Sequence, residues 1–221
     1  LAKGPSKEAL VKAPLFAGME KGIITRFEEI TRCPSEIQDS LISILSDKVL
    51  NIPELGDEGL LFAKPGFNVI GTANTRDKGV NEMSSALKRR FNFETIFPIK
   101  DVSLEAKIIT NEVNKLKNEN SIEMEVDNDV AELLASTFHE LREGISSNGM
   151  RIDKPSAVMS TAEAVSVYYQ TMMNAYYYGD SEISLDSMVQ NILGAVAKES
   201  RDDLEKLRNY FNVVVKAKSL E

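Results

Sequence analysis

A short β-prone run early in the chain, Ile23-Ile24-Thr25-Arg26-Phe27, stops at two adjacent acids, Glu28 and Glu29. In open α/β sheets, ligands bind at the carboxyl ends of the strands, which is where these two carboxylates would stand. One carboxylate can hold a Mg²⁺ ion while the second orients or deprotonates an attacking water. The alternative is a strand followed by the first turn of a helix, where the helix dipole favours acids. This stretch alone leaves both interpretations open.

The residues around this run alternate between helix and strand signals. Apolar residues at helical spacing predict an amphipathic helix over residues 34–45, with Pro34 in its first turn. Residues 49–62 contain Pro and Gly between β-prone residues and predict a hairpin. The stretch Phe67-Asn68-Val69-Ile70-Gly71 predicts a second strand, apolar enough to be buried on both faces of a parallel sheet.

A short helix over residues 81–90 and a third strand over residues 93–99 complete the first part of the chain. This alternation predicts the α/β class, with a partial parallel-sheet core of about three strands plus a hairpin. From residue 101 onward the pattern is helical, with helices expected over the following ranges: 102–118, 128–145, 155–178 and 185–217. An all-α domain over residues 101–221 is therefore expected to follow an α/β domain over residues 1–100.

The charge distribution supports this division. Residues 1–100 carry 14 Lys/Arg against 13 Asp/Glu, whereas the remaining residues carry 12 against 21. Such an acidic second half argues against nucleic-acid binding, which depends on cationic contacts with phosphates. No apolar stretch approaches the length that spans a bilayer, and the single cysteine suits a reducing cytoplasm.

Two further motifs carry polar side chains that suit phosphate chemistry. Asn74 in Gly71-Thr72-Ala73-Asn74-Thr75 has a donor and an acceptor that could hold a water near a phosphate, although Asn is also a common turn residue. Arg89 and Arg90 in Ala86-Leu87-Lys88-Arg89-Arg90-Phe91 could reach a neighbouring subunit's nucleotide. They could equally be cations that stabilise a helix C-terminus.

Taken in order, the three motifs resemble the MoxR-type branch of the AAA+ ATPases over the whole stretch from Gly22 to Phe91. The run that ends in the two acids is similar to that family's Walker B element. The resemblance implies that Glu28 binds Mg²⁺, at a position where the family usually has Asp, and that Glu29 activates water. Either carboxylate can hold magnesium.

The same resemblance implies a sensor-1 role for Asn74, which would position the attacking water. It implies that Arg90, with Arg89 second, acts as an arginine finger on the ATP of a neighbouring subunit. The helical second half resembles the AAA+ lid, which normally contributes a sensor-2 arginine. No Arg follows Pro155 in the corresponding stretch, so Arg151 or Lys154 is the candidate to contact the nucleotide.

The glycine-rich Walker A loop, G-x-x-x-x-G-K-[ST], does not occur in the 221 residues. The family places this loop upstream of residue 1, so these residues alone are expected to bind nucleotide poorly. The resemblance implies that the intact protein couples hydrolysis of Mg-ATP, in a hexameric ring, to remodelling or maturation of client proteins. A protein with a von Willebrand A domain is an expected partner. The alternative is a degenerate AAA+ subunit or lid fragment that serves as a non-catalytic interaction scaffold.

Overall fold

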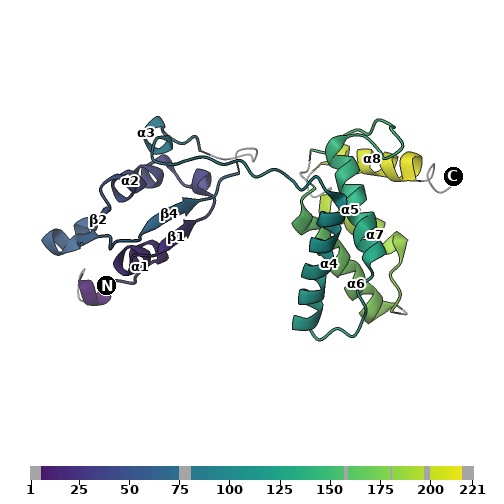
Figure 1. The fold of residues 1–221 in the computed structure, drawn as a ribbon, viewed down its shortest axis with the longest axis horizontal. Helices are drawn as coiled ribbons and strands as arrows, with labels where there is room; N and C mark the ends of the chain where they lie inside the picture. The colour runs from purple at the N-terminus through teal and green to yellow at the C-terminus, as the bar shows by residue number, and fades with distance from the viewer. Residues whose placement is uncertain (1–5, 75–80, 157–158, 180, 197–199, 216–221) are drawn as a thin grey trace. The chain divides into compact units, whose positions relative to one another are not determined.

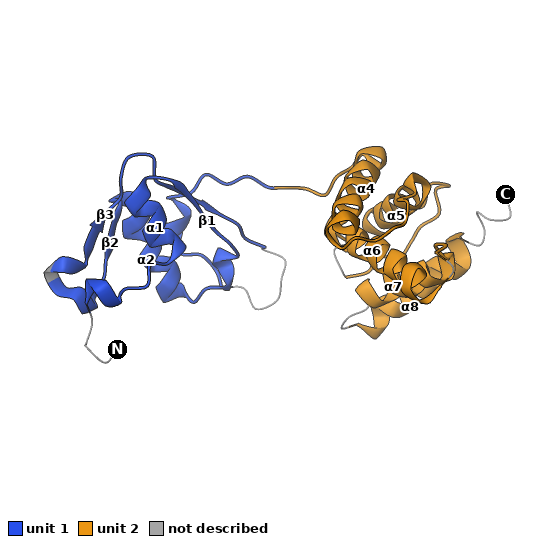
Figure 2. Cartoon of the chain, turned by 90° about the horizontal axis from the view of Figure 1, so that it is seen from below, with its two compact units in different colours: residues 1–95 blue, residues 96–221 orange. Residues whose placement is uncertain are grey.

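The computed structural model describes residues 6–74, 81–156, 159–179, 181–196 and 200–215. The chain divides into two compact units, Leu1–Thr95 and Ile96–Glu221, which are coloured separately in Figure 2. Unit 1 contains all the strands of the described residues, and unit 2 is helical. Their boundary lies close to residue 100, where the charge balance of the sequence changes.

Unit 1 is built on two pairs of strands (Figure 1). Strand β1 (Ile24–Phe27) runs parallel to β4 (Asn68–Gly71), with Thr25 opposite Val69. Strands β2 (Val49–Asn51) and β3 (Leu60–Phe62) form the expected antiparallel hairpin. The parallel arrangement confirms an α/β class for this unit, since parallel neighbours require a crossover connection through other elements.

Helices α1 (Pro14–Lys21) and α2 (Ser35–Ser46) precede and follow β1 along the chain. Helix α1 packs closely on the strand, because a Cβ added at Gly18 would lie 1.9 Å from the Thr25 hydroxyl oxygen. A glycine is therefore required at this crossing. The buried core of the unit consists of these residues: Met19, Ile30, Leu41, Ile44, Phe67, Val69, Met83 and Leu87.

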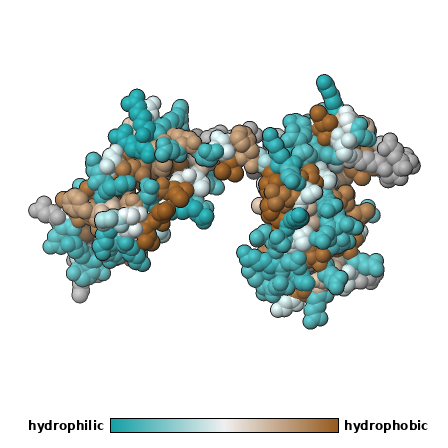
Figure 3. All heavy atoms as spheres, viewed as in Figure 1, coloured by the Kyte–Doolittle hydropathy of each residue, from teal (hydrophilic) through white to brown (hydrophobic). Residues whose placement is uncertain are grey.

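The opposite face of the β1–β4 pair carries exposed apolar side chains, although β4 was expected to be buried on both faces. Ile24 is 62% exposed and Ile70 is 54% exposed, and Figure 3 shows hydrophobic residues on the surface of unit 1. No second layer of described residues covers this face. Strand β4 is therefore buried on one face only, although its sequence is apolar enough for burial on both.

The predicted third strand over residues 93–99 is not formed. A strand needs a hydrogen-bonded neighbour, and none of the described residues pairs with this segment. Phe93, Ile96 and Phe97 are consequently exposed. The parallel sheet of the described chain therefore has two strands rather than about three, and the helix expected over 81–90 is limited to α3 (Ser85–Lys88).

Unit 2 contains five α-helices among its described residues: α4 (Val102–Glu119), α5 (Asn128–Glu143), α6 (Thr161–Tyr178), α7 (Leu185–Val196) and α8 (Arg201–Asn209). The prediction of an all-α second half is confirmed. None of the described helices is both long and apolar enough to cross a membrane.

Two helix boundaries in unit 2 differ from the predicted ones. Helix α6 begins at Thr161 rather than at residue 155, because Ser160 and Glu163 form a capping box that fixes its N-terminus. The single helix expected over 185–217 is divided into α7 and α8. Ser200 caps α8 by accepting a hydrogen bond from the Asp203 amide, and a π-helical turn (Tyr210–Val215) follows.

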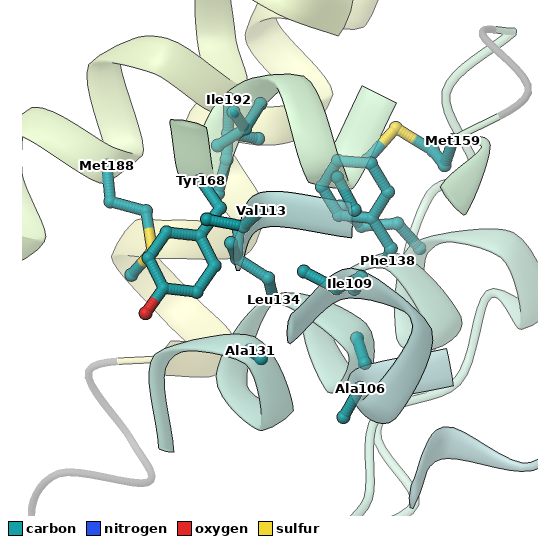
Figure 4. Packing of buried hydrophobic residues seen from close by; sticks show 14 of the residues in the cluster. Ala106, Ile109, Val113, Ala131, Leu134, Phe138, Met159, Tyr168, Met188 and Ile192 are labelled. Carbon is teal, nitrogen blue, oxygen red and sulfur yellow. The ribbon is translucent and has the colours of Figure 1, made fainter. Parts of the chain in front are cut away.

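The core of unit 2 forms where α4, α5 and α6 pack together, with α7 and the C-terminal turn against them (Figure 4). Phe138, Tyr168 and Met172 are fully buried in it. The Tyr168 hydroxyl donates a 2.8 Å hydrogen bond to the Asp127 carbonyl, and burial raises the pKa of Tyr168 to about 12. The polar end of this large side chain is thus satisfied inside the core.

A buried ion pair joins α4 to α5 in this unit. The Glu105 side chain is fully buried and that of Arg142 is 7% exposed. Arg142 Nη1 donates to Glu105 Oε1 at 2.9 Å and to the Met159 carbonyl at 2.8 Å, and Arg142 Nη2 donates to the second carboxylate oxygen. The Thr161 hydroxyl adds a 2.8 Å bond to Glu105. Several hydrogen bonds therefore compensate each buried charge.

We expect Arg142→Ala to lower the free energy of unfolding of unit 2 by about 3 kcal/mol, because it leaves the Glu105 carboxylate buried without a counter-charge. Urea-dependent hydrogen exchange, read on peptides of unit 2, measures this change. Lys115→Ala is the control, since Lys115 pairs with Glu112 only on the surface, at 3.9 Å, and should cost less than about 1 kcal/mol. Equal effects of the two variants would contradict the assigned role of the buried pair.

Candidate functional site

The parallel pairing of β1 and β4 places the residues that follow both strands at one edge of unit 1. The Thr72 amide donates a 2.9 Å hydrogen bond to the Phe27 carbonyl, and the Ile30 amide donates a 2.9 Å bond to the Thr72 carbonyl. Residues 28–30, which we name the acid turn, therefore lie against Thr72. Asn74 continues from Thr72 on the same segment, so the paired acids and the candidate sensor residue leave neighbouring strands at the same end.

The two carboxylates of the acid turn are exposed and each pairs with a nearby arginine. Glu28 Oε1 lies 2.5 Å from Arg26 Nη2, and Glu29 Oε2 lies 2.7 Å from Arg32 Nε. Exposed pairs of this kind contribute at most about 1 kcal/mol, so either carboxylate can exchange its arginine for another cation at little cost.

The donor set at this edge fits a magnesium ion that is bound together with a nucleotide. Mg²⁺ in such sites is held by one or two carboxylates, with phosphates and waters as its remaining ligands. Glu28 and Glu29 supply two carboxylates. No group of three or more His, Cys, Asp or Glu capable of holding a metal occurs within the described parts of the chain.

Glu29 adopts a left-handed backbone conformation, with φ 51° and ψ 47°. For a non-glycine residue this conformation costs about 1–2 kcal/mol. The Glu29 amide donates a 3.1 Å hydrogen bond to the Thr72 hydroxyl, which helps to hold it. Left-handed residues fixed by their surroundings occur often at functional sites, and here the residue is the candidate water-activating acid.

The residues that directly follow the acid turn are held by two side-chain amides. Gln38 Nε2 and Asn81 Nδ2 donate to the Cys33 carbonyl at 2.9 and 3.0 Å, and the Asn81 amide donates to the Thr31 carbonyl at 2.6 Å. Gln38 belongs to α2 and is 1% exposed. The residues that carry the acids are therefore attached both to α2 and to the segment that follows the candidate sensor.

Thr72, Gln38 and Asn81 were not among the residues that the sequence predicted for this site. The burial of Gln38 could have been predicted from its spacing, since it lies one helical turn before the buried Leu41. Ile37, which was predicted to face the core, is half exposed. Thr72 was part of the quoted sensor stretch, but its hydroxyl contact depends on a backbone conformation of Glu29 that no sequence pattern indicates. The hydrogen bonds of Asn81 to Thr31 and Cys33 join parts of the chain that are distant in sequence, so no local pattern predicts them.

The structure places Asn74 at an exposed position after β4. Residues 75–80, which include Thr75 of the sensor stretch, lie outside the described residues. The backbone path brings Asn74 to the edge that carries the acid turn. Its role in positioning a water remains a prediction.

The two candidate finger arginines differ in their surroundings. Arg90 Nε donates to the Ser46 hydroxyl at 2.9 Å and Arg90 Nη1 donates to the Ala86 carbonyl at 2.7 Å. Arg89, at the C-terminus of α3, is exposed, and its guanidinium makes no hydrogen bond or ion pair within the described part of the chain. Arg89 is thus the more available of the two cations, although the sequence pattern ranked Arg90 first.

The two candidate sensor-2 residues belong to unit 2, whereas the acid turn belongs to unit 1. Arg151 is exposed and forms an isolated antiparallel bridge with Ile145. The aliphatic part of Lys154 lies over Gly144, where an added Cβ would come within 2.6 Å of Lys154 Cε. A contact of Arg151 or Lys154 with nucleotide therefore remains a prediction.

Comparison with known proteins assigns both units. Residues 2–91 match the AAA domain of the dynein-related subfamily, and residues 103–221 match the YehL-like AAA+ ATPase C-terminal domain. The protein YehL of Escherichia coli (strain K12) is 47% identical over 212 residues, which cover 94% of this chain. The chain spans 58% of the length of that relative. The expected AAA+ membership is confirmed within the MoxR-like group of families.

Replacement of Glu29 by glycine tests the backbone strain in the acid turn. We expect Glu29→Gly to raise the free energy of unfolding of unit 1 by about 1 kcal/mol, because glycine adopts positive φ without the Cβ clash. Glu29→Gln, which keeps the strain and removes the charge, should change it by less than about 0.5 kcal/mol. Urea-dependent hydrogen exchange on peptides of unit 1 distinguishes the two. Both variants lose the ion pair with Arg32, so a Glu29→Gly variant no more stable than Glu29→Gln would show that the left-handed conformation is not strained.

Proposed function

The chain belongs to the YehL-like AAA+ ATPase family, and we propose that the full-length protein hydrolyses Mg-ATP at the edge of unit 1 that carries the acid turn. The observation that carries the proposal is the parallel pairing of β1 with β4. This pairing puts Glu28 and Glu29 beside the segment that leads to Asn74. Two carboxylates and an amide at one sheet edge are among the side chains that hydrolysis of a phosphoanhydride uses.

Each residue has a distinct proposed role. Glu28 holds the magnesium ion, which when bound neutralises charge on the phosphate oxygens. Glu29 accepts a proton from the attacking water, and Asn74 orients that water through its amide. Arg151 or Lys154 contacts the nucleotide from unit 2. The exposed ion pairs of Glu28 and Glu29 leave both carboxylates accessible for these roles.

The same proposal includes assembly into a hexameric ring in the cytoplasm, with each nucleotide completed by an arginine of the neighbouring subunit. Arg90 or Arg89 supplies this charge: the sequence pattern favours Arg90, whereas the two hydrogen bonds of Arg90 within unit 1 leave Arg89 the more available. The exposure of Arg89 and its lack of a partner among the described residues support a role outside its own subunit. Energy from hydrolysis would remodel or mature client proteins, with a von Willebrand A domain protein as partner.

The role of Glu29 is tested by Glu29→Gln in the full-length protein, because residues 1–221 contain no Walker A loop. We expect the kcat for ATP to fall at least about 100-fold, since the variant removes a general base, while the KM stays within about threefold. Steady-state phosphate release measures both constants. Glu54→Gln removes an exposed acid in the β2–β3 connection and should leave them unchanged. Turnover by Glu29→Gln within twofold of the parent would remove Glu29 from this role.

Action of the arginine across a subunit boundary is tested by mixing variants. Arg90→Ala and Glu29→Gln should each be nearly inactive alone, because each removes one component of every site. A randomly mixed 1:1 ring should recover about one quarter of the parent activity, since about one quarter of its sites pair an intact Glu29 with an intact neighbouring arginine. Arg89→Ala, tested in the same way, ranks the two arginines. Absence of recovery with both arginine variants would contradict action in trans.

A further inference from the structure

The hydrogen-bond ladder between β1 and β4 departs from a regular parallel pattern at Glu29. In a regular ladder, the Thr72 amide donates to the Phe27 carbonyl and the Thr72 carbonyl accepts from the amide of residue 29. The first of these bonds is present, at 2.9 Å, but the Thr72 carbonyl accepts from Ile30 instead. Glu29 is therefore an extra residue in the ladder, and its amide has lost its backbone acceptor.

The side chain of Thr72 provides the replacement acceptor. Its hydroxyl oxygen lies 3.1 Å from the Glu29 amide nitrogen. Thr72, two residues before Asn74, thus makes three hydrogen bonds to the end of β1 and the acid turn. Its amide donates to Phe27, its carbonyl accepts from Ile30, and its hydroxyl accepts from Glu29. Among the described residues, the Thr72 hydroxyl is the one hydrogen-bond acceptor of the Glu29 amide.

We propose that Thr72 is a positioning residue, whose hydroxyl holds the left-handed backbone of Glu29 and so fixes the acid relative to the segment that carries Asn74. The catalytic consequence rests on the proposed function of Glu29. Since Thr is β-branched and its χ1 angle is restricted, the hydroxyl is held at little cost in entropy. Thr72 thereby sets the position of the general base relative to the water-orienting amide.

The hydroxyl of Thr72 is a suitable group to test because it does not belong to the core. Thr72 is exposed, and its hydroxyl makes its hydrogen bond at the surface. Loss of the hydroxyl therefore leaves the buried residues of unit 1 in place. Thr72→Val keeps the shape of the side chain without the acceptor, and Thr72→Ser keeps the acceptor without the methyl group.

The first measurement is amide hydrogen exchange at Glu29 by NMR in the 221-residue chain. We expect exchange at this amide to be about tenfold faster in Thr72→Val than in the parent, because its acceptor is lost, while Thr72→Ser remains within about threefold. The amides of the unit 1 core should be unchanged in both variants. Unchanged exchange at Glu29 in Thr72→Val would overturn the proposal, whatever the activity of the protein.

The second measurement is ATP hydrolysis by the full-length protein. Thr72→Val should lower the kcat about tenfold and leave the KM within about twofold, since misplacement of a catalytic group affects the chemical step. Thr72→Ser should restore most of the kcat. Equal losses in both variants, or none in Thr72→Val, would contradict positioning through the hydroxyl. If Glu29→Gln kept full turnover while Thr72→Val still exposed the Glu29 amide, the proposed function would fail and the hydrogen bond would stand.

Discussion

The parallel pairing of β1 with β4 is the constraint on which the candidate site depends. Only with this register does the Thr72 amide reach the Phe27 carbonyl, and only then does the acid turn lie against Thr72 and the residues that lead to Asn74. The close crossing of α1 at Gly18 and the buried side chains of α2 hold this strand pair from one face. Strand β4, which follows α2 and the β2–β3 hairpin in the chain, therefore decides where the acids stand.

Ion pairs serve different purposes in the two units because their surroundings differ. Glu28 and Glu29 pair with arginines at the surface, where water screens the attraction and the pairs exchange readily. Glu105 and Arg142 are buried, and additional hydrogen bonds from Thr161 and to the Met159 carbonyl compensate their desolvation. The first arrangement leaves carboxylates available for chemistry, whereas the second fixes the packing of α4, α5 and the start of α6.

Local patterns predicted those parts of the fold that local interactions determine. The strand at Ile24–Phe27, the β2–β3 hairpin and helix α4 follow from alternation, turn residues and helical spacing. The prediction of a third strand over residues 93–99 was wrong, because a strand depends on a distant partner, which no local pattern can supply. The paired acids were found because their chemistry is visible in the residue types. The contributions of Thr72 and Gln38 were missed because they arise from the left-handed turn at Glu29 and from burial, both of which are tertiary.

The most direct test of this account is an experimental structure of the full-length protein with Mg²⁺ and a non-hydrolysable ATP analogue. We expect Glu29 and Asn74 to face the γ-phosphate from the ends of β1 and β4, with Glu28 at the metal and the Glu29 amide still bonded to the Thr72 hydroxyl. A nucleotide bound elsewhere, or an acid turn detached from Thr72 in the occupied site, would contradict it.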